Sequence, residues 1–129
     1  MDPVGDSLLA RLIGLELASV VFVRDYLQLD FDGPRLSCYV WPTIDADGIT
    51  RSLGDPGYRD TLCALISQTV VSTQEAVGTG LVLRFAIGAL SIHPTPEELE
   101  GPEIAMLAGF PDRAWGVWRP GENTFADLE

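Results

Sequence analysis

Two stretches of the chain share one alternation of apolar and polar positions. LQLDFDGPRLSCYVWP (27–42) has an apolar residue at every second position on either side of a turn sequence, and LVLRFAIGALSIHP (81–94) repeats that spacing. A period of two is typical of a half-buried β-strand. DGPR (32–35) and AIGA (86–89) interrupt the alternation with residues that favour turns. Each stretch is therefore predicted to form a β-hairpin.

The similarity extends to the residues that precede each hairpin. SLLARLIG (7–14) resembles TLCALIS (61–67) at an offset of 53 positions, and the hairpins match at an offset of 54. Each copy contains a short helical turn, an extended segment and a hairpin. We therefore predict two internal repeats, over about 7–42 and 61–94.

The repeats predict how the core is built. We expect Phe31 to pair with Leu36 in the first hairpin, and Phe85 to pair with Leu90 in the second. A single hairpin with one apolar face is not stable alone in water. Packing the two apolar faces together would bury both. We therefore expect a roll or sandwich with a pseudo-two-fold axis and with Phe31 and Phe85 at equivalent core positions.

The remaining segments complete the predicted architecture. Residues 42–57 are rich in Asp, Gly and Pro and are predicted to form a surface loop. Residues 103–109 and 113–121 are predicted to contain short strands within an acidic C-terminal segment, 95–129. The expectation is a single domain, 1–129, of the α+β class with mainly antiparallel β-structure.

Charge narrows the range of partners. Nineteen Asp and Glu residues face eight Arg residues and no Lys, which gives a formal net charge of −11. Nucleic acids and anionic membranes attract cationic surfaces, so neither is an expected partner. An acidic protein can instead be attracted to a basic protein partner.

The chain is expected to be cytoplasmic. It has no apolar run near the ~18 residues that span a bilayer, and MDPVGDSLLARLIG lacks the basic region of a signal peptide. Cys38 and Cys63 lie in apolar segments and are predicted to be reduced and buried. Two cysteines and one histidine cannot form a standard zinc site unless carboxylates complete it, and no metal is predicted.

The sequence contains no standard catalytic motif, and no catalytic residue or cofactor is predicted. His93 is the one histidine. We expect it on the polar face of the second hairpin near Val82, with Arg84 farther along that face. A general base needs a substrate or nucleophile within reach, and Ser91 is the nearest residue of that type. A surface role is therefore favoured over catalysis.

Aromatic residues form the clearest candidate binding patch. Tyr26, Tyr39 and Trp41 are predicted on the outward face of the first hairpin, with Tyr26 opposite Trp41 and Tyr39 opposite Gln28. Exposed aromatic side chains among acidic residues are typical of protein-binding surfaces. The alternative is that another layer of the protein covers them.

The hairpin LVLRFAIGALSIHP and the acidic PEIAML segment that follows it carry a resemblance. They resemble small, mostly uncharacterised actinobacterial proteins with an L-x-L-x-F-x-x-G-x-L-x-I hairpin followed by an acidic strand, over roughly residues 60–108. Some proteins of that type are described as immunity proteins to secreted or contact-delivered toxins. The resemblance implies a protein-binding role and no catalytic residues.

The sequence is therefore compatible with three functions. The first is a non-catalytic acidic binding protein, in the form of an immunity-type inhibitor of a basic toxin or enzyme. The second is a small-molecule-binding protein or enzyme with a pocket between the hairpin layers, lined by Tyr39, Trp41, Arg84 and His93. The third is a structural or assembly subunit that forms a homodimer. The candidate binding residues are Tyr26, Tyr39, Trp41, Arg84 and His93.

Overall fold

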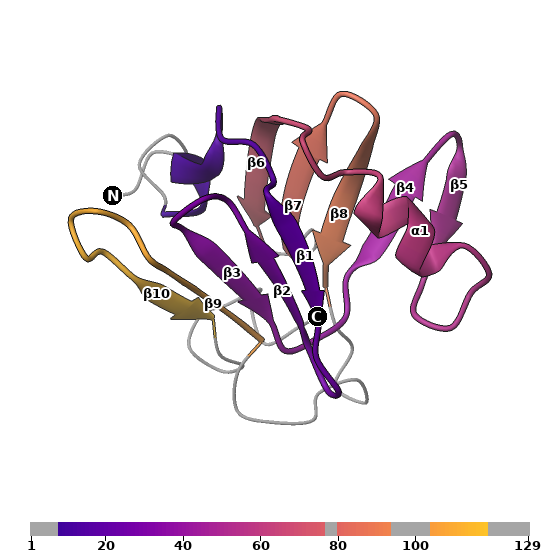
Figure 1. Ribbon diagram of the computed structural model, residues 1–129, viewed down its shortest axis with the longest axis horizontal. Coiled ribbons are helices and arrows are strands. Elements are labelled where there is room, and N and C mark those ends of the chain that lie inside the picture. The colour runs from indigo at the N-terminus through magenta and orange to yellow at the C-terminus, as the bar shows by residue number, and fades with distance from the viewer. Residues whose placement is uncertain (1–7, 77–79, 94–103, 119–129) are drawn as a thin grey trace.

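Two antiparallel five-stranded sheets pack against each other in the computed structural model, which describes residues 8–76, 80–93 and 104–118 (Figure 1). The elements in chain order are η2 (Leu9–Leu12), β1 (Ser19–Phe22), β2 (Leu27–Asp30), β3 (Arg35–Cys38), β4 (Thr43–Ala46), β5 (Ile49–Arg51), α1 (Tyr58–Cys63), β6 (Val70–Ala76), β7 (Gly80–Phe85), β8 (Gly88–Ile92), β9 (Ala105–Ala108) and β10 (Gly116–Trp118). The predicted class, mainly antiparallel β-structure with short helices, is confirmed.

Each sheet combines strands from both halves of the chain. The first sheet has the order β1-β2-β3-β9-β10, and the second has the order β5-β4-β8-β7-β6. The β4–β5 hairpin therefore joins the later strands β6–β8, whereas the β9–β10 hairpin joins the earlier strands β1–β3. The two C-terminal strands were predicted, but their place beside β3 was not.

Alternation along the strands builds the core between the sheets. One row of paired residues crosses four strands of the first sheet with every side chain buried, and it consists of Leu27, Cys38, Ala105 and Trp118. Ile44, Leu90 and Leu83 form a similar buried row in the second sheet. The exposed fractions of Phe31 and Phe85 are 1% and 5%. Both phenylalanines are core residues, as predicted.

The predicted pairing inside both hairpins is wrong by two residues. Leu36 pairs with Leu29 and not with Phe31, and Leu90 pairs with Leu83 and not with Phe85. Phe31 instead donates its backbone N–H to the Pro34 carbonyl at 2.7 Å. The turns are shorter than expected. Because side chains alternate with a period of two, a shift of two residues preserves the buried face.

Residues 42–57 are not the surface loop that their composition predicted. They contain the β4–β5 hairpin, in which Ile44 pairs with Arg51 and Ala46 pairs with Ile49. Asp47 and Gly48 form the turn, with φ values of 56° and 76°. Asp-Gly with positive φ at both positions is a favoured two-residue hairpin turn. Within this range, the residues between β5 and α1 form no strand.

The segments that follow the two helices are joined by backbone hydrogen bonds. Gly14 donates to the Val70 carbonyl at 2.9 Å, and Ser67 donates to the Leu17 carbonyl at 2.7 Å. Two further bonds run from Leu17 N–H to Gln68 and from Val70 N–H to Leu15. This short ladder ties the start of the first half to the start of the second.

The two cysteines have different environments. Cys38 is buried in the first sheet, as expected, but Cys63 at the end of α1 is exposed. The expectation that both are buried is therefore wrong for Cys63. Its helix places Tyr58 and Leu62 toward the core and leaves Cys63 exposed. Both thiols are free.

Candidate functional site

Tyr26 and Tyr39 form an aromatic pair at adjacent ends of β2 and β3. Their ring centroids are 5.5 Å apart at an interplanar angle of 45°. The neighbouring residues Leu27 and Cys38 point into the core, so the two tyrosines point outward and are half-buried. The outward orientation was predicted. The predicted partners, Trp41 and Gln28, are wrong because the hairpin pairs two residues out of the expected register.

Trp41 belongs to a different cluster. Its ring stacks on Phe22 of β1, with centroids 6.4 Å apart, and it packs against the core. The Arg59 guanidinium from α1 lies 5.5 Å from the centre of the Phe22 ring. The three residues join α1 to the first sheet. Trp41 is therefore covered in part by the rest of the protein, which was the alternative to full exposure.

Arg84 and His93 lie on the second sheet, away from the aromatic residues. Arg84 is exposed on β7 and donates to the Gln74 side-chain oxygen at 3.1 Å. His93 is exposed after β8 and lies beside Gly80, not near Val82 as predicted, because Val82 pairs with Ser91. Gly80 and Arg84 are four residues apart on one strand, about 13 Å. The five predicted binding residues therefore do not form one cluster.

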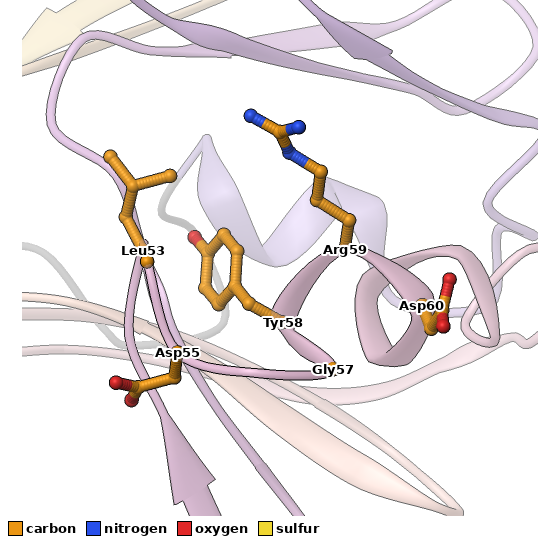
Figure 2. Close-up of a pocket in the computed structure, with 7 residues that line it drawn as sticks. Leu53, Asp55, Gly57, Tyr58, Arg59 and Asp60 are labelled. Carbon is orange, nitrogen blue, oxygen red and sulfur yellow. The ribbon is translucent and has the colours of Figure 1, made fainter.

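A cavity of about 550 Å³ lies between α1 and the loop that follows β5 (Figure 2). Leu53, Gly54, Asp55, Gly57, Tyr58, Arg59 and Asp60 line it. Two of its polar side chains, Tyr58 and Asp55, have local hydrogen-bond partners. Tyr58 donates its hydroxyl to the Pro42 carbonyl, and Asp55 accepts the Ser52 backbone N–H at 2.8 Å. We call this space the helix cavity and regard these contacts as structural.

Cys38 and Tyr58, two buried groups that lie near each other, have strongly shifted pKa values. Burial raises the pKa of the Cys38 thiol to about 12. Burial, and secondarily the nearby Cys38, raises the pKa of the Tyr58 hydroxyl well above its usual range. Both groups are neutral at pH 7. Desolvation of the charged form explains these shifts without any catalytic role.

A second cavity, of about 570 Å³, lies beside the β2–β3 turn, and we call it the turn cavity. Its apolar wall comes from three separate segments and includes Leu15, Phe31, Pro34, Phe110 and Pro111. Arg11, Gly14, Glu16, Ala18 and Asp32 complete the lining. Its volume is within the ~300–1,000 Å³ common for ligand pockets, and its lining combines apolar and charged residues.

Pairing between β3 and β9 creates the turn cavity. Arg35 pairs with Ala108, so the residues after β9 lie beside the β2–β3 turn. Gly109 is so close to this turn that a Cβ there would lie 2.3 Å from the Gly33 carbonyl oxygen. On the other side, Ala18 donates its N–H to the Asp30 carbonyl at 2.7 Å.

Two ion pairs lie in or next to the segments that form the turn cavity, and one of their residues, Arg11, is part of its lining. Arg11 donates to both carboxylate oxygens of Asp112, at 3.0 and 3.2 Å, and its guanidinium lies 5.4 Å from the centre of the Phe110 ring. The Ala114 backbone N–H, followed by Arg11, lowers the pKa of the Asp112 carboxyl. Arg35 forms the second pair with Asp30, at 3.3 Å.

Glu16 and Asp32 give the turn cavity its charge. Both are exposed, and within the described part of the chain neither carboxylate has an ion pair. The charged residues of the lining are Glu16, Asp32 and Arg11, and Arg11 is already paired with Asp112. The lining therefore has two carboxylates without an ion pair to any described residue, beside apolar residues.

The residues of the turn cavity were not predicted as a site. The turn DGPR (32–35) was predicted from the sequence, but GFPDR (109–113), which also contains an acid and turn-forming residues, was not, and nothing in the sequence indicates that the two meet. Their meeting depends on the β3–β9 pairing. Among the described residues, no group of three or more His, Cys, Asp and Glu side chains is arranged to hold a metal ion.

The protein is a β-sandwich of two antiparallel sheets. At one end it has a cavity that is lined by acidic and apolar residues. Comparisons with protein-family models, curated proteins and solved structures gave no match. No helix within the described residues is long and apolar enough to cross a membrane.

Proposed function

We propose that this chain is a non-catalytic, acidic binding protein whose partner is a basic protein. The observation that carries the proposal is the turn cavity, which places two carboxylates without ion pairs among the described residues, Glu16 and Asp32, beside an apolar lining in which Leu15 is half-buried and Pro111 is exposed. A cationic side chain with an aliphatic stem complements such a surface.

Net charge supports the same partner at longer range. The described residues contain ten acidic residues and seven arginines, so most of the −11 charge belongs to the remainder of the sequence. A strongly acidic chain accelerates association with a basic surface, and salt weakens this effect. We propose a cytoplasmic immunity-type inhibitor of a basic toxin or enzyme as the particular form of this function.

Binding of candidate partners at two salt concentrations tests the proposal. The full chain is immobilised and exposed to each product of the neighbouring genes, purified separately, in about 50 and about 500 mM NaCl. We expect one basic product to bind in low salt and to bind at least about tenfold more weakly in high salt. If no basic product binds, or if binding does not respond to salt, the proposal is wrong.

We also propose that the two halves of the chain are related by an approximate two-fold axis. Each of the strands β1 to β5 corresponds to the strand five places later, β6 to β10. If the labels of corresponding strands are exchanged, the order of the first sheet, β1-β2-β3-β9-β10, becomes β6-β7-β8-β4-β5, which is the order of the second sheet read from β6. The hydrogen bond from Gly14 to Val70 corresponds in the same way to that from Ser67 to Leu17, at an offset of 53 positions. The positive φ values of Gly14 and Ser67, 90° and 77°, also correspond.

The arrangement of the candidate residues does not favour a second function. The small-molecule alternative requires Tyr39, Trp41, Arg84 and His93 around one pocket, and these residues lie in separate places on the two sheets. Sedimentation at several protein concentrations distinguishes a homodimeric assembly subunit from a monomeric inhibitor. A mass that stays at one chain over that range supports the inhibitor.

A further inference from the structure

We infer that the turn cavity receives an arginine side chain of the basic partner, with its guanidinium between the Glu16 and Asp32 carboxylates and its aliphatic stem on the apolar wall. This inference rests on the proposed function, because it names the group by which the partner is recognised. The cavity volume of about 570 Å³ is within the ~300–1,000 Å³ common for ligand pockets.

Arg11 shows that the cavity wall accommodates a guanidinium. Its guanidinium lies over the Phe110 ring at 5.4 Å while it donates to the Asp112 carboxylate at 3.0 Å. Stacking on an aromatic ring combined with bonding to a carboxylate is the characteristic mode of arginine recognition. The protein therefore already contains an internal example of the contact that we infer for the partner.

The arrangement of the carboxylates favours arginine over lysine. Glu16 lies in the segment before β1 and Asp32 in the β2–β3 turn, so the two acids approach the cavity from different segments. A planar guanidinium has five N–H donors and can bond two separate carboxylates at once while its face contacts an apolar wall. An ammonium group is compact and strongly hydrated, and it gains less from such a wall.

Arg11 also competes with the incoming side chain. It covers the Phe110 ring and contributes a positive charge to the lining, and its side chain remains 46% exposed. Removing it would open the aromatic surface and make the lining more negative by one charge. Loss of Arg11 should therefore strengthen binding of a cation, whereas loss of Glu16 or Asp32 should weaken it.

The cavity at the corresponding turn of the second sheet provides an internal comparison. It has about 350 Å³, lies at the β7–β8 turn, and includes Arg84, Phe85 and Asp45 in its lining. Asp45 already accepts a hydrogen bond from the Thr50 hydroxyl. Its lining has no counterpart of Phe110, and it should not bind the same side chain.

A peptide titration followed by NMR tests the inference. The ¹⁵N-labelled full chain is titrated with acetyl-Gly-Arg-Gly-amide, with the lysine peptide, and with the citrulline peptide, which has nearly the same shape without the charge. We expect saturable shifts of the Glu16, Asp32 and Phe110 amides, and no shift at Asp47 or Ile87. Affinity should follow the order arginine, lysine, citrulline, with about fivefold or more between arginine and citrulline.

Matched variants separate local contacts from net charge. Asp32→Asn and Glu16→Gln should each weaken arginine-peptide binding about threefold, and Arg11→Ala should strengthen it by a similar factor. The controls are Asp25→Asn and Arg24→Ala, exposed residues in the β1–β2 turn at the far end of the first sheet, which change net charge equally. Both controls should leave the affinity within about 1.5-fold.

Several results would overturn the inference. These are equal binding of the citrulline peptide, shifts confined to other surfaces, and equal effects of Asp25→Asn and Asp32→Asn. Weaker binding by a folded Arg11→Ala variant would overturn the competing role of Arg11. If the arginine peptide does not bind but a basic gene product does, the inference fails and the proposed function stands. If the peptide binds the cavity but no basic protein binds the chain, the proposed function fails.

Discussion

The indole N–H of Trp118 donates a hydrogen bond to a carboxylate oxygen of Glu75 at 2.7 Å. Trp118 is in β10 at the edge of the first sheet, and Glu75 is in β6 at the edge of the second. The contact therefore joins the two sheets along one side of the sandwich. It also provides the buried Trp118 with a partner for its one polar group.

Trp118→Phe should destabilise the protein by about 1–2 kcal/mol, because it removes a hydrogen bond to a charged group and part of a buried ring. Urea unfolding followed by circular dichroism measures the change. Trp115→Phe is the matched control, since Trp115 is 64% exposed, and should change stability by less than about 0.5 kcal/mol. Equal effects of the two substitutions would show that the Glu75 contact does not stabilise the sandwich.

Phe31→Ala and Phe85→Ala should each cost about 3–5 kcal/mol, because both rings are almost inaccessible and their removal leaves a cavity in the core. Val71→Ala is a suitable control on β6, where Val71 is 58% exposed. Thermal and urea unfolding report the loss. A cost below about 1 kcal/mol at either phenylalanine would contradict its place in the core.

Gly14→Ser and Ser67→Gly should have opposite effects. Both positions have positive φ, which a residue with a Cβ adopts at a cost of about 1–2 kcal/mol. We expect Gly14→Ser to destabilise the protein by about 1 kcal/mol. Ser67→Gly should stabilise it by up to about the same amount. The gain is reduced because glycine has more conformational freedom in the unfolded chain and loses more entropy on folding. Urea midpoints measure both changes. Destabilisation by Ser67→Gly would contradict this account.

Stability should decrease at alkaline pH because of Cys38. Burial raises the pKa of its thiol from the ordinary value of 9.0 to about 12. A group with a raised folded-state pKa contributes stability below its unfolded-state pKa, and this contribution is lost as the pH rises from 9 toward 12. Ionisation of buried Tyr58 acts in the same direction at higher pH. Urea unfolding should give a constant free energy from pH 7 to 8 and a fall of up to about 1.4 kcal/mol per pH unit and per group above pH 9.

A thiol reagent distinguishes the two cysteines in the same preparation. Native protein should react at exposed Cys63 and not at buried Cys38, whereas unfolded protein should react at both. Cys63→Ser should leave the alkaline loss of stability unchanged. Rapid native labelling at Cys38 would contradict its burial and the expected pH dependence.

Local patterns made the hairpins predictable. Alternation and turn residues within about 16 positions are sufficient to identify β2–β3 and β7–β8 and to place Phe31 and Phe85 inside. The pairing was wrong by two residues because four-residue turns were assumed where the chain makes two-residue turns. The β4–β5 hairpin was missed even though it contains an Asp-Gly turn, since polar residues outnumber apolar ones around it.

The candidate site depends on contacts that leave no local pattern. Phe110 meets Phe31 because β9 pairs with β3, and 67 positions separate the end of β3 at Cys38 from the start of β9 at Ala105. Sequential strands pair more often than distant ones, so the sequence alone favoured a different neighbour for β3. The aromatic residues Tyr26 and Tyr39 were found because their outward orientation follows from alternation alone.

The exchange of hairpins between the sheets has a consequence for synthesis on the ribosome. Gly88, the first residue of β8, follows the end of β4 at Ala46 by 42 positions, and Ala105 of β9 follows the end of β3 at Cys38 by 67. Neither sheet can form all of its strand pairs while only the first half of the chain has emerged from the ribosome. Until then β3 and β4 have strand edges that can pair with other chains. Folding is therefore delayed until nearly the whole chain has been made, and products of early termination should aggregate rather than persist as half-proteins.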